Sequence, residues 1–200
     1  RFPKGATATD APEALEIANH LGYPVLVRPS FVLGGKGMAV VHNDDELNEY
    51  LIPALKNSHG EPILIDQYIP GTECEVDILS DGNDVFVPGI MEHLEGAGIH
   101  SGDSIAMYPP QTLTDDQKEK IVAIATKIGK QVHAVGMMNI QFIVADEVYV
   151  IEVNPRASRT VPFMSKIVKL HLAQLATQLI LGKSLAEIGL KPGLHPEPAK

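Results

Sequence analysis

Two short apolar segments near the middle of the second half constrain the fold of this chain most. Residues 142–144 (Phe-Ile-Val) and 148–151 (Val-Tyr-Val-Ile) are β-branched or aromatic, and Asp146-Glu147 stand between them. Such residues favour strands, and a short polar segment between two strands favours a hairpin. The sequence therefore predicts an antiparallel hairpin over about residues 139–154.

Polar side chains gather at the far end of this predicted hairpin. Side chains alternate along a strand, so Glu152 and Asn154 point to one face, close to Gln141 on the first arm, with Arg156 just beyond. Oxygen donors beside a cation suit a magnesium-bound polyphosphate. The pattern predicts a phosphoryl-transfer site, and the alternative is that Glu152 is only a solvated residue at a strand edge.

Composition narrows the class of protein. The chain has 200 residues, 44% hydrophobic and 20% charged, which is typical of a globular chain of one domain or two small lobes. A net charge of −9 without a cluster of Lys and Arg argues against nucleic-acid binding. Cys74 is the single cysteine, which excludes an intrachain disulfide and fits a reducing, cytoplasmic location. No run approaches the roughly 18–20 apolar residues of a membrane helix.

The first 60 residues predict the order helix, strand, glycine loop, strand, helix. The helices are expected over residues 10–21 and 43–55, the strands over 23–28 and 38–41. Gly34, Gly35 and Lys36 join two strands instead of leading into a helix, so they do not form a Walker-type loop. A glycine hairpin tip can fold over phosphates through its N–H groups, with Arg28 nearby, and the alternative is a plain flexible tip.

The next segments predict a strand over residues 61–69, whose extended end could bind a planar base edge, and a second strand over 73–79. Alternation sets Glu73, Glu75 and Asp77 on one face of that second strand. The alternative is an edge strand kept soluble by its charges. A turn at residues 80–83 and a return strand at 84–91 complete the pattern.

Residues 92–104 are rich in Gly, Ser and charged residues and predict a functional loop, in which His100 is a candidate ligand contact. An amphipathic helix is expected over residues 114–132. Closing helices are expected over residues 170–181 and 184–188. The proline-rich residues 191–200 predict a linker or a frayed tail.

Four motifs in this order resemble the ATP-grasp superfamily, and within it the carbamoyl-phosphate synthase large subunit. The resemblance covers nearly the whole chain, with Val-Arg-Pro-Ser-Phe-Val-Leu-Gly-Gly at 27–35, Ile-Met-Glu-His at 90–93, Gly-Ile-His-Ser-Gly-Asp-Ser at 98–104 and Glu-Val-Asn-Pro-Arg-Ala-Ser-Arg-Thr-Val-Pro-Phe at 152–163. It implies an α+β ATP-grasp fold of two lobes, with mainly antiparallel sheets and packed helices. The expected domain spans residues 1–190, its small lobe about 10–67 and its large lobe about 68–190, and a further lobe is expected upstream of Arg1.

Residues 32–35, 91–93 and 159–163 are most similar to the C-terminal half of that subunit. In the family this half phosphorylates carbamate to carbamoyl phosphate with release of ADP, which supplies arginine and pyrimidine synthesis. The alternatives are the bicarbonate-phosphorylating half, another ATP-grasp carboxylate ligase, and a nucleotide-binding fragment that is inactive alone. The implied partners are the rest of the large subunit and a glutaminase small subunit, with no nucleic acid and no membrane.

The resemblance also implies roles for individual residues. Glu152 would bridge two Mg²⁺ or Mn²⁺ ions next to ATP or ADP, Gln141 and Asn154 would complete the coordination, and K⁺ is a further candidate ion. Arg156 and Arg159, together with Asn154, would act on carbamate and the transferred phosphoryl group. The remaining nucleotide contacts implied are Arg28, Gly34, Gly35 and Lys36 at the phosphates, Gln67 and Ile69 at adenine, Glu73 at ribose, and Gly98, Ile99, His100 and Ser101 on the far side.

Overall fold

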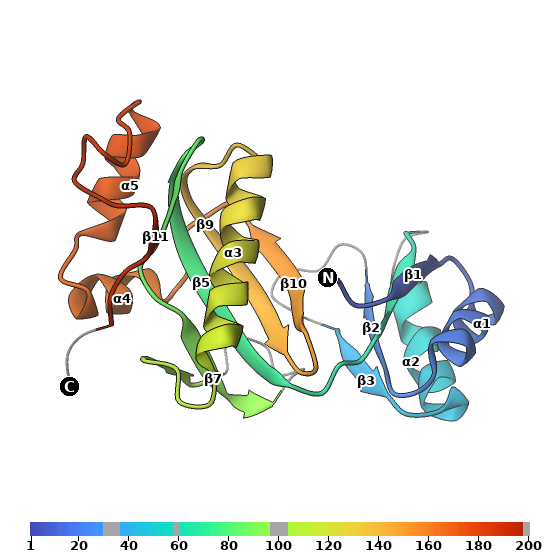
Figure 1. Cartoon of the computed structure of the whole chain (residues 1–200). Helices are drawn as coiled ribbons and strands as arrows, with labels where there is room; N and C mark the ends of the chain where they lie inside the picture. The colour runs from blue at the N-terminus through green and yellow to red at the C-terminus, as the bar shows by residue number, and fades with distance from the viewer. Residues whose placement is uncertain (30–36, 58–60, 97–103, 198–200) are drawn as a thin grey trace. The chain divides into compact units, whose positions relative to one another are not determined.

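The structure is a computed structural model that describes residues 1–29, 37–57, 61–96 and 104–197, with the side chains of Lys56 and Asn57 left out. The chain divides into two compact units (Figure 1). The N-terminal unit comprises Phe2–Pro70 together with Gly96–Ser104. The C-terminal unit comprises Arg1, Gly71–Glu95 and Ile105–Lys200. Each unit has a hydrophobic core of its own, so each is described by itself.

The N-terminal unit is an antiparallel sheet covered by two helices. The sheet order is β1 (Gly5–Ala8), β4 (Ile63–Gln67), β2 (Val25–Pro29) and β3 (Ala39–Val41). Helices α1 (Ala11–Leu21) and α2 (Asp44–Asn57) pack on it through Ala14, Ala18, Leu47 and Leu51. The helices and strands expected here are confirmed, whereas β1 was not predicted because Gly-Ala-Thr-Ala is a weak strand sequence.

The C-terminal unit is built on a seven-stranded sheet. Its main path runs β10 (Val148–Asn154), β9 (Val135–Val144), β5 (Thr72–Asp81), β6 (Val85–Val87) and β11 (Gly193–Leu194), while β7 (Met91–Gly96) pairs with β5 and β8 (Ala106–Met107). Helix α3 (Asp115–Gln131) lies across one face (Figure 1). Helices α4 (Val161–Ile167) and α5 (Leu172–Ile180) belong to a second core, built with Leu79, Phe86 and Met91.

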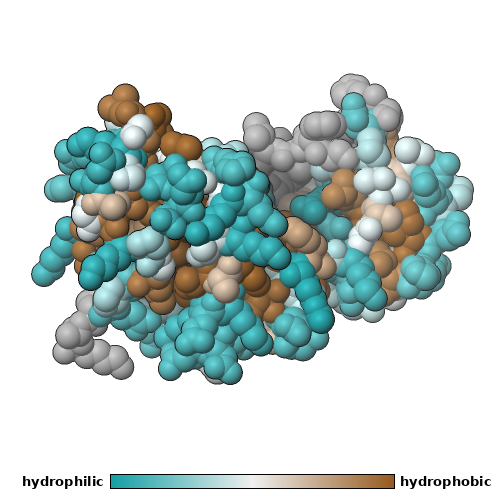
Figure 2. Space-filling view, turned by 45° about the horizontal axis from the view of Figure 1, so that its top comes forward, coloured by the Kyte–Doolittle hydropathy of each residue, from teal (hydrophilic) through white to brown (hydrophobic). Residues whose placement is uncertain are grey.

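Alternation along β5 and β9 separates the two faces of this sheet. The side chains that pack with α3 are Cys74, Val76 and Ile78 of β5 and Met138, Ile140 and Phe142 of β9. The intervening residues of β5, Glu73, Glu75 and Asp77, therefore occupy the opposite face, as the sequence predicted. Hydrophilic residues cover much of the visible surface of the C-terminal unit, and apolar residues show between them and in a patch at its upper left (Figure 2).

A β-bulge decides which way the polar end of β10 faces. Val150 pairs with Phe142 and Glu152 pairs with Gln141, so Ile151 is an extra residue on β10. Val148 and Val150 pack in the α3 core, and beyond the bulge Val153 does so. Uninterrupted alternation from Val150 would have pointed Glu152 and Asn154 into that apolar core. The bulge places both on the face that bears the β5 carboxylates.

Two predictions for residues 84–104 need correction. The return strand over residues 84–91 is split into β6 and the start of β7, because Pro88 lacks an N–H group for the ladder. The expected loop over residues 92–104 begins as strand β7, with Glu92 2% and His93 4% exposed. These charged residues tolerate burial because both are hydrogen-bonded: Glu92 accepts from Gln111 N (2.7 Å) and from Thr112 N and Oγ1 (both 2.9 Å).

The C-terminal segment also differs from expectation. The helix expected over residues 184–188 is absent, since residues 185–189 form turns that end at Gly189 with φ 76°. Gly193 and Leu194 pair with β6, and His195 N donates to Val87 O at 2.8 Å, so this part of the expected linker or frayed tail lies against the sheet. Helix α4 was not predicted. No helix in the described ranges is long and apolar enough to span a membrane.

Close packing of α3 on the sheet leads to a first prediction. A Cβ added at Gly129 would lie 2.8 Å from Ile78 Cδ1 and 2.8 Å from Val85 Cγ2, and both side chains are fully buried. Overpacking costs roughly 1–3 kcal/mol, which exceeds the gain of about 1 kcal/mol in helix propensity for Gly129→Ala. We expect this change to lower the free energy of unfolding in urea.

The matched control is Ala123→Gly on the exposed side of α3. It changes helix propensity alone and should cost about 1 kcal/mol. An increase in stability with Gly129→Ala would contradict the close contact between α3 and the sheet.

Candidate active site

Two rows of oxygen-bearing side chains cross the sheet face opposite α3. The strand register aligns Glu75 of β5 with Gln141 of β9, and Gln141 with Glu152 of β10. The second row, one pair of residues further along, consists of Asp77, Asn139 and Asn154. Directly opposed residues in an antiparallel pair share a face, with Cβ atoms about 4.5–5.5 Å apart. The three strands thus form one surface of carboxylates and amides.

The rows pass from a buried end to an accessible end. On β5 and β9, Glu75 is 2%, Asp77 4% and Asn139 1% exposed. Gln141 and Asn154 are half-buried, and Glu152 at the outer strand is exposed. The buried residues at the inner end are therefore suited to stabilising the sheet, and the accessible residues at the outer end are suited to contacting a ligand.

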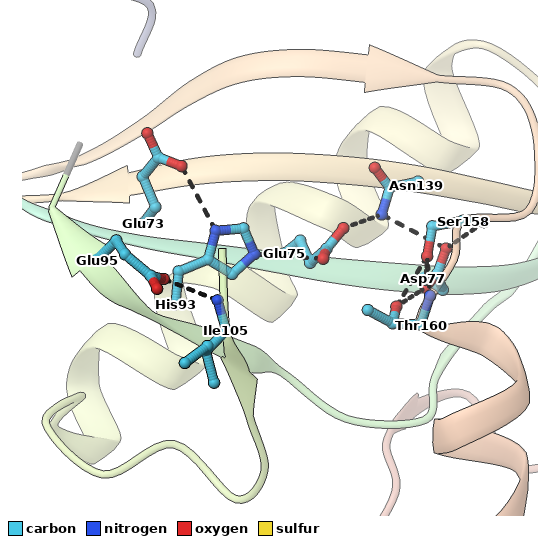
Figure 3. Close-up of polar contacts among 9 residues, drawn as sticks. All are labelled: Glu73, Glu75, Asp77, His93, Glu95, Ile105, Asn139, Ser158 and Thr160. Atoms are coloured by element: carbon cyan, nitrogen blue, oxygen red, sulfur yellow. Dashed lines mark hydrogen bonds and ion pairs between the residues drawn. The ribbon is translucent and has the colours of Figure 1, made fainter. Parts of the chain in front are cut away.

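A buried histidine sits between two carboxylates at the inner end (Figure 3). His93 Nδ1 lies 3.4 Å from Glu73 Oε2, and His93 Nε2 lies 3.2 Å from Glu75 Oε1. Burial disfavours the charged imidazolium, but the hydrogen bonds and charges of Glu73 and Glu75 outweigh it and raise the pKa of His93 to about 9. At neutral pH the His93 side chain is consequently a cation that offsets part of the carboxylate charge.

Asn139 connects the two inner carboxylates, whose pKa values shift in opposite directions. Its Nδ2 atom donates to Glu75 Oε2 at 2.8 Å and to Asp77 Oδ1 at 3.4 Å. For Glu75, burial raises the pKa, but His93 and Asn139 outweigh burial and hold it below its ordinary value. For Asp77, burial dominates over the hydrogen bonds from Ser158 and Thr160, and the pKa is raised.

The segment between β10 and α4 brings two arginines to the same end of the sheet. Arg156 and Arg159 are exposed, while Ser158 between them is half-buried and Thr160 is buried. Arg156 N donates to Asn154 O at 2.7 Å, which turns the chain directly after the strand. Arg159 also contributes to lowering the pKa of Glu75. A planar anion next to Glu152 and Asn154 would meet guanidinium groups here.

The outer end of the rows fits a hard divalent cation. No group of three or more His, Cys, Asp or Glu residues with metal-binding geometry occurs among the described residues. Within the described part of the chain, Asn139 Oδ1 and Asn154 Nδ2 are buried without a hydrogen-bond partner. An unpaired buried amide is costly, and turning the Asn154 amide would present its oxygen to a cation. Gln141, Glu152 and Asn154 are oxygen donors of the kind Mg²⁺ prefers.

The other predicted site residues are distributed over both units. Arg28 lies on β2, where its Nη2 atom is 2.8 Å from Asp66 Oδ2, and burial raises the pKa of Asp66 despite that partner. Gln67 is exposed at the end of β4, Ile69 is buried, and Glu73 is buried beside His93. Lying outside the described residues are Gly34, Gly35, Lys36, Gly98, Ile99, His100 and Ser101.

Sequence reasoning missed the residues that support this face from within: His93, Asn139, Ser158 and Thr160. The alternation of Glu73, Glu75 and Asp77 gave one signal, because three buried carboxylates require donors. His93 comes two residues after the largely apolar segment 85–91, which was a second signal that it enters the sheet. Partners for Asp77 lie 81 and 83 residues away along the chain, and no local pattern indicates such a contact.

Solved structures define the class of fold. Biotin carboxylase from Campylobacter jejuni, described as a complex with β-γ-ATP, superposes with a TM-score of 0.80 at 21% identity, covering 92% of this chain and 43% of that one. The biotin carboxylase domain of Hydrogenobacter thermophilus 2-oxoglutarate carboxylase, described with MgADP, ADP and bicarbonate, gives 0.75 at 25% identity over the same shares. The fold is the ATP-grasp fold, as predicted.

Sequence comparison then gives the family. Residues 2–188 match the model of the carbamoyl-phosphate synthase L chain, ATP binding domain, and this chain belongs to that family. The arginine-specific carbamoyl phosphate synthase large chain of Lactiplantibacillus plantarum is 64% identical over 190 residues, which is 95% of this chain. The chain spans 19% of the length of that relative.

The buried histidine gives a second prediction. Because the pKa of His93 is raised from 6.5 to about 9, its ionic contacts stabilise the fold fully below pH 6.5 and are lost as the pH rises through about 9. We expect the free energy of unfolding to fall over this window. We expect His93→Gln to lower stability at pH 7 by roughly 3–5 kcal/mol and to flatten the pH dependence.

His171→Gln is the control, because His171 is exposed and its side chain makes no capping hydrogen bond at α5. Its pH profile should follow that of the unmodified chain. Equal slopes in the unmodified chain and in His93→Gln between pH 6.5 and 9 would disprove a charged His93.

Proposed function

We propose that this chain transfers the γ-phosphoryl group of ATP to carbamate, as the C-terminal synthetase half of a carbamoyl-phosphate synthase. The observation that carries the proposal is the two-row face of β5, β9 and β10, with oxygen donors at its accessible end and Arg156 and Arg159 beside them. The family and the 64% identity to a large chain support it. Similarity of residues 159–163 to the C-terminal half favours carbamate over bicarbonate.

The reaction needs positioning and charge neutralisation, and no nucleophile from the protein. A carbamate oxygen would attack the γ-phosphorus as the bond to the leaving oxygen breaks, giving carbamoyl phosphate and ADP. Arg156 and Arg159 would hold carbamate and the transferred group, because a guanidinium fork matches planar oxyanions. Two reacting groups held in line react far faster than free ones. Arg28 in the N-terminal unit would bind the nucleotide phosphates.

Magnesium would draw charge from the β- and γ-phosphates when bound. Glu152, Gln141 and Asn154 would hold it, since they supply one carboxylate and two amides at the accessible end of the rows. Glu75 and Asp77 would stay behind them as buried support. We propose further that the site holds two such ions, that Mn²⁺ can replace Mg²⁺, and that K⁺ is an additional candidate ion.

The remaining contacts and partners follow from the family. Gln67, Ile69 and Glu73 would surround the adenosine, with Gly34, Gly35, Lys36 and residues 98–101 at the phosphates and the far side. A glutaminase small subunit would supply ammonia, and the rest of the large subunit would supply carbamate. We propose that this reaction takes place in the cytoplasm and supplies arginine synthesis.

A third prediction separates the two synthetase halves within the complete enzyme. Glu152→Gln keeps the shape but removes a charge that would hold the metal. We expect ATP formation from carbamoyl phosphate and MgADP to fall by about 100-fold or more, while bicarbonate-dependent ATP hydrolysis continues. Both rates are measured on one preparation.

The matched control is Glu147→Gln at the turn of the same hairpin, where the pair with Arg1 spans 3.8 Å at the surface and contributes little. It should leave both rates unchanged. The reverse pattern, with bicarbonate-dependent hydrolysis lost in Glu152→Gln, would assign this chain to the bicarbonate-phosphorylating half. Two unchanged rates would refute the site.

A further inference from the structure

Asp77 is a buried carboxylate that holds the segment between β10 and α4 (Figure 3). Its Oδ2 atom accepts from Ser158 Oγ at 2.6 Å and from Thr160 Oγ1 at 2.7 Å. Its Oδ1 atom accepts from Ser158 N at 3.2 Å and from Asn139 Nδ2 at 3.4 Å. Four donors thus converge on one side chain that is 4% exposed. Such a satisfied buried group fixes its partners, because losing any donor leaves a desolvated charge.

The segment held in this way has two sides. Ser158 and Thr160 turn inward and lie against each other, with their hydroxyl oxygens 2.7 Å apart and Thr160 N donating to Ser158 Oγ at 3.0 Å. Arg156 and Arg159 are exposed. The small hydroxyl residues therefore bind the sheet while the long cationic residues face solvent. The position of each guanidinium group therefore depends on a backbone that Asp77 holds through Ser158 and Thr160.

This support comes from rigid elements on both sides. Asp77 lies in the middle of β5 and faces Asn139 of β9 in the ladder, so the backbone that bears the carboxylate is held by the sheet. Thr160 directly precedes α4, whose Val161 and Met164 are buried in the second core. The segment between these fixed points spans residues 155–160, and Asp77 holds it at both Ser158 and Thr160.

We propose that Asp77 is a positioning residue for phosphoryl transfer: through Ser158 and Thr160 it sets the placement of Arg156 and Arg159 against the anionic substrate. The inference rests on the proposed function and extends it to a residue that touches neither nucleotide nor substrate. Moving Arg156 and Arg159 would change the alignment of the anionic substrate more than the binding of the nucleotide. A displacement of about 1 Å at a reacting centre can cost about 100-fold in rate.

The test is Asp77→Asn in the complete enzyme, assayed by ATP formation from carbamoyl phosphate and MgADP. Asparagine keeps the shape but sets an N–H₂ group against donors, so the segment loses part of its support. We expect kcat/KM for carbamoyl phosphate to fall by roughly 10- to 100-fold. The Kd for MgADP, measured by calorimetry, should stay the same.

Two comparisons separate positioning from general stability. Asp81→Asn is the matched control, because Asp81 lies on the same strand and accepts from Leu185 N at 2.9 Å, in a segment without arginines of the site. It should leave kcat/KM unchanged. Thr160→Val removes one hydroxyl donor and should reproduce part of the Asp77→Asn defect, whereas Thr160→Ser keeps the hydroxyl and should keep the rate.

The outcomes distinguish this inference from the function it rests on. No ATP formation by the unmodified enzyme would overturn the proposed function, and the inference with it. An active enzyme in which Asp77→Asn and Thr160→Val retain kcat/KM would overturn the inference alone. So would an equal loss of MgADP binding and rate, since that indicates a general collapse. Should Asp77→Asn fail to fold, the difference between Thr160→Val and Thr160→Ser decides.

Discussion

Burying three carboxylates along one strand is the constraint on which the C-terminal unit depends. Glu73, Glu75 and Asp77 are each less than 9% exposed, and an unpaired charge at such a depth would be too costly for the fold. The buried carboxylates are compensated in two ways. Glu73 and Glu75 share the His93 cation, and Asp77 relies on neutral donors from a distant segment. The same contacts that pay for burial also tie β7, β9 and the segment before α4 to β5.

The two faces of the sheet divide the tasks of the unit. The face toward α3 is continuously apolar, and its burial supplies the main driving force for folding. The opposite face carries apolar residues such as Leu79, Phe86 and Met91 where it meets the helices that follow the hairpin. Its remaining part presents the two polar rows. A site built on strands is more precise than one built on loops, and the candidate site lies on three strands of the sheet.

Local patterns predicted much of this structure. The α1, α3 and hairpin assignments rest on caps, periodicity and β-branched residues, all of which act over a few residues. The same-face arrangement of the β5 acids follows from alternation alone. The Ile151 bulge, the burial of Glu92 and the contact of residues 193–195 with β6 were not predicted. Glu92 depends on donors about 20 residues away and residues 193–195 on a strand more than 100 residues away, and tertiary contacts override local preference there.

The motifs of the candidate site were visible because their residue types are unusual for their positions, such as Glu152 and Asn154 at the end of an apolar strand. Their inner support was not visible, since serine, threonine and asparagine are common and occur in any loop. Ser158 and Thr160 acquire meaning only from Asp77, which precedes them by about 80 residues. The sequence thus indicated the accessible residues of the candidate site better than the buried residues that support them.

The extra residue in β10 has a consequence for how this strand can vary. Val148 and Val150 before Ile151 pack in the α3 core, whereas Glu152 and Asn154 beyond it lie on the face of the candidate site. A single strand therefore contains two independent sets of constraints, joined at one position. Substitutions in its first half can tune stability without reshaping the ligand surface, but a one-residue insertion or deletion at the junction would exchange the two sets.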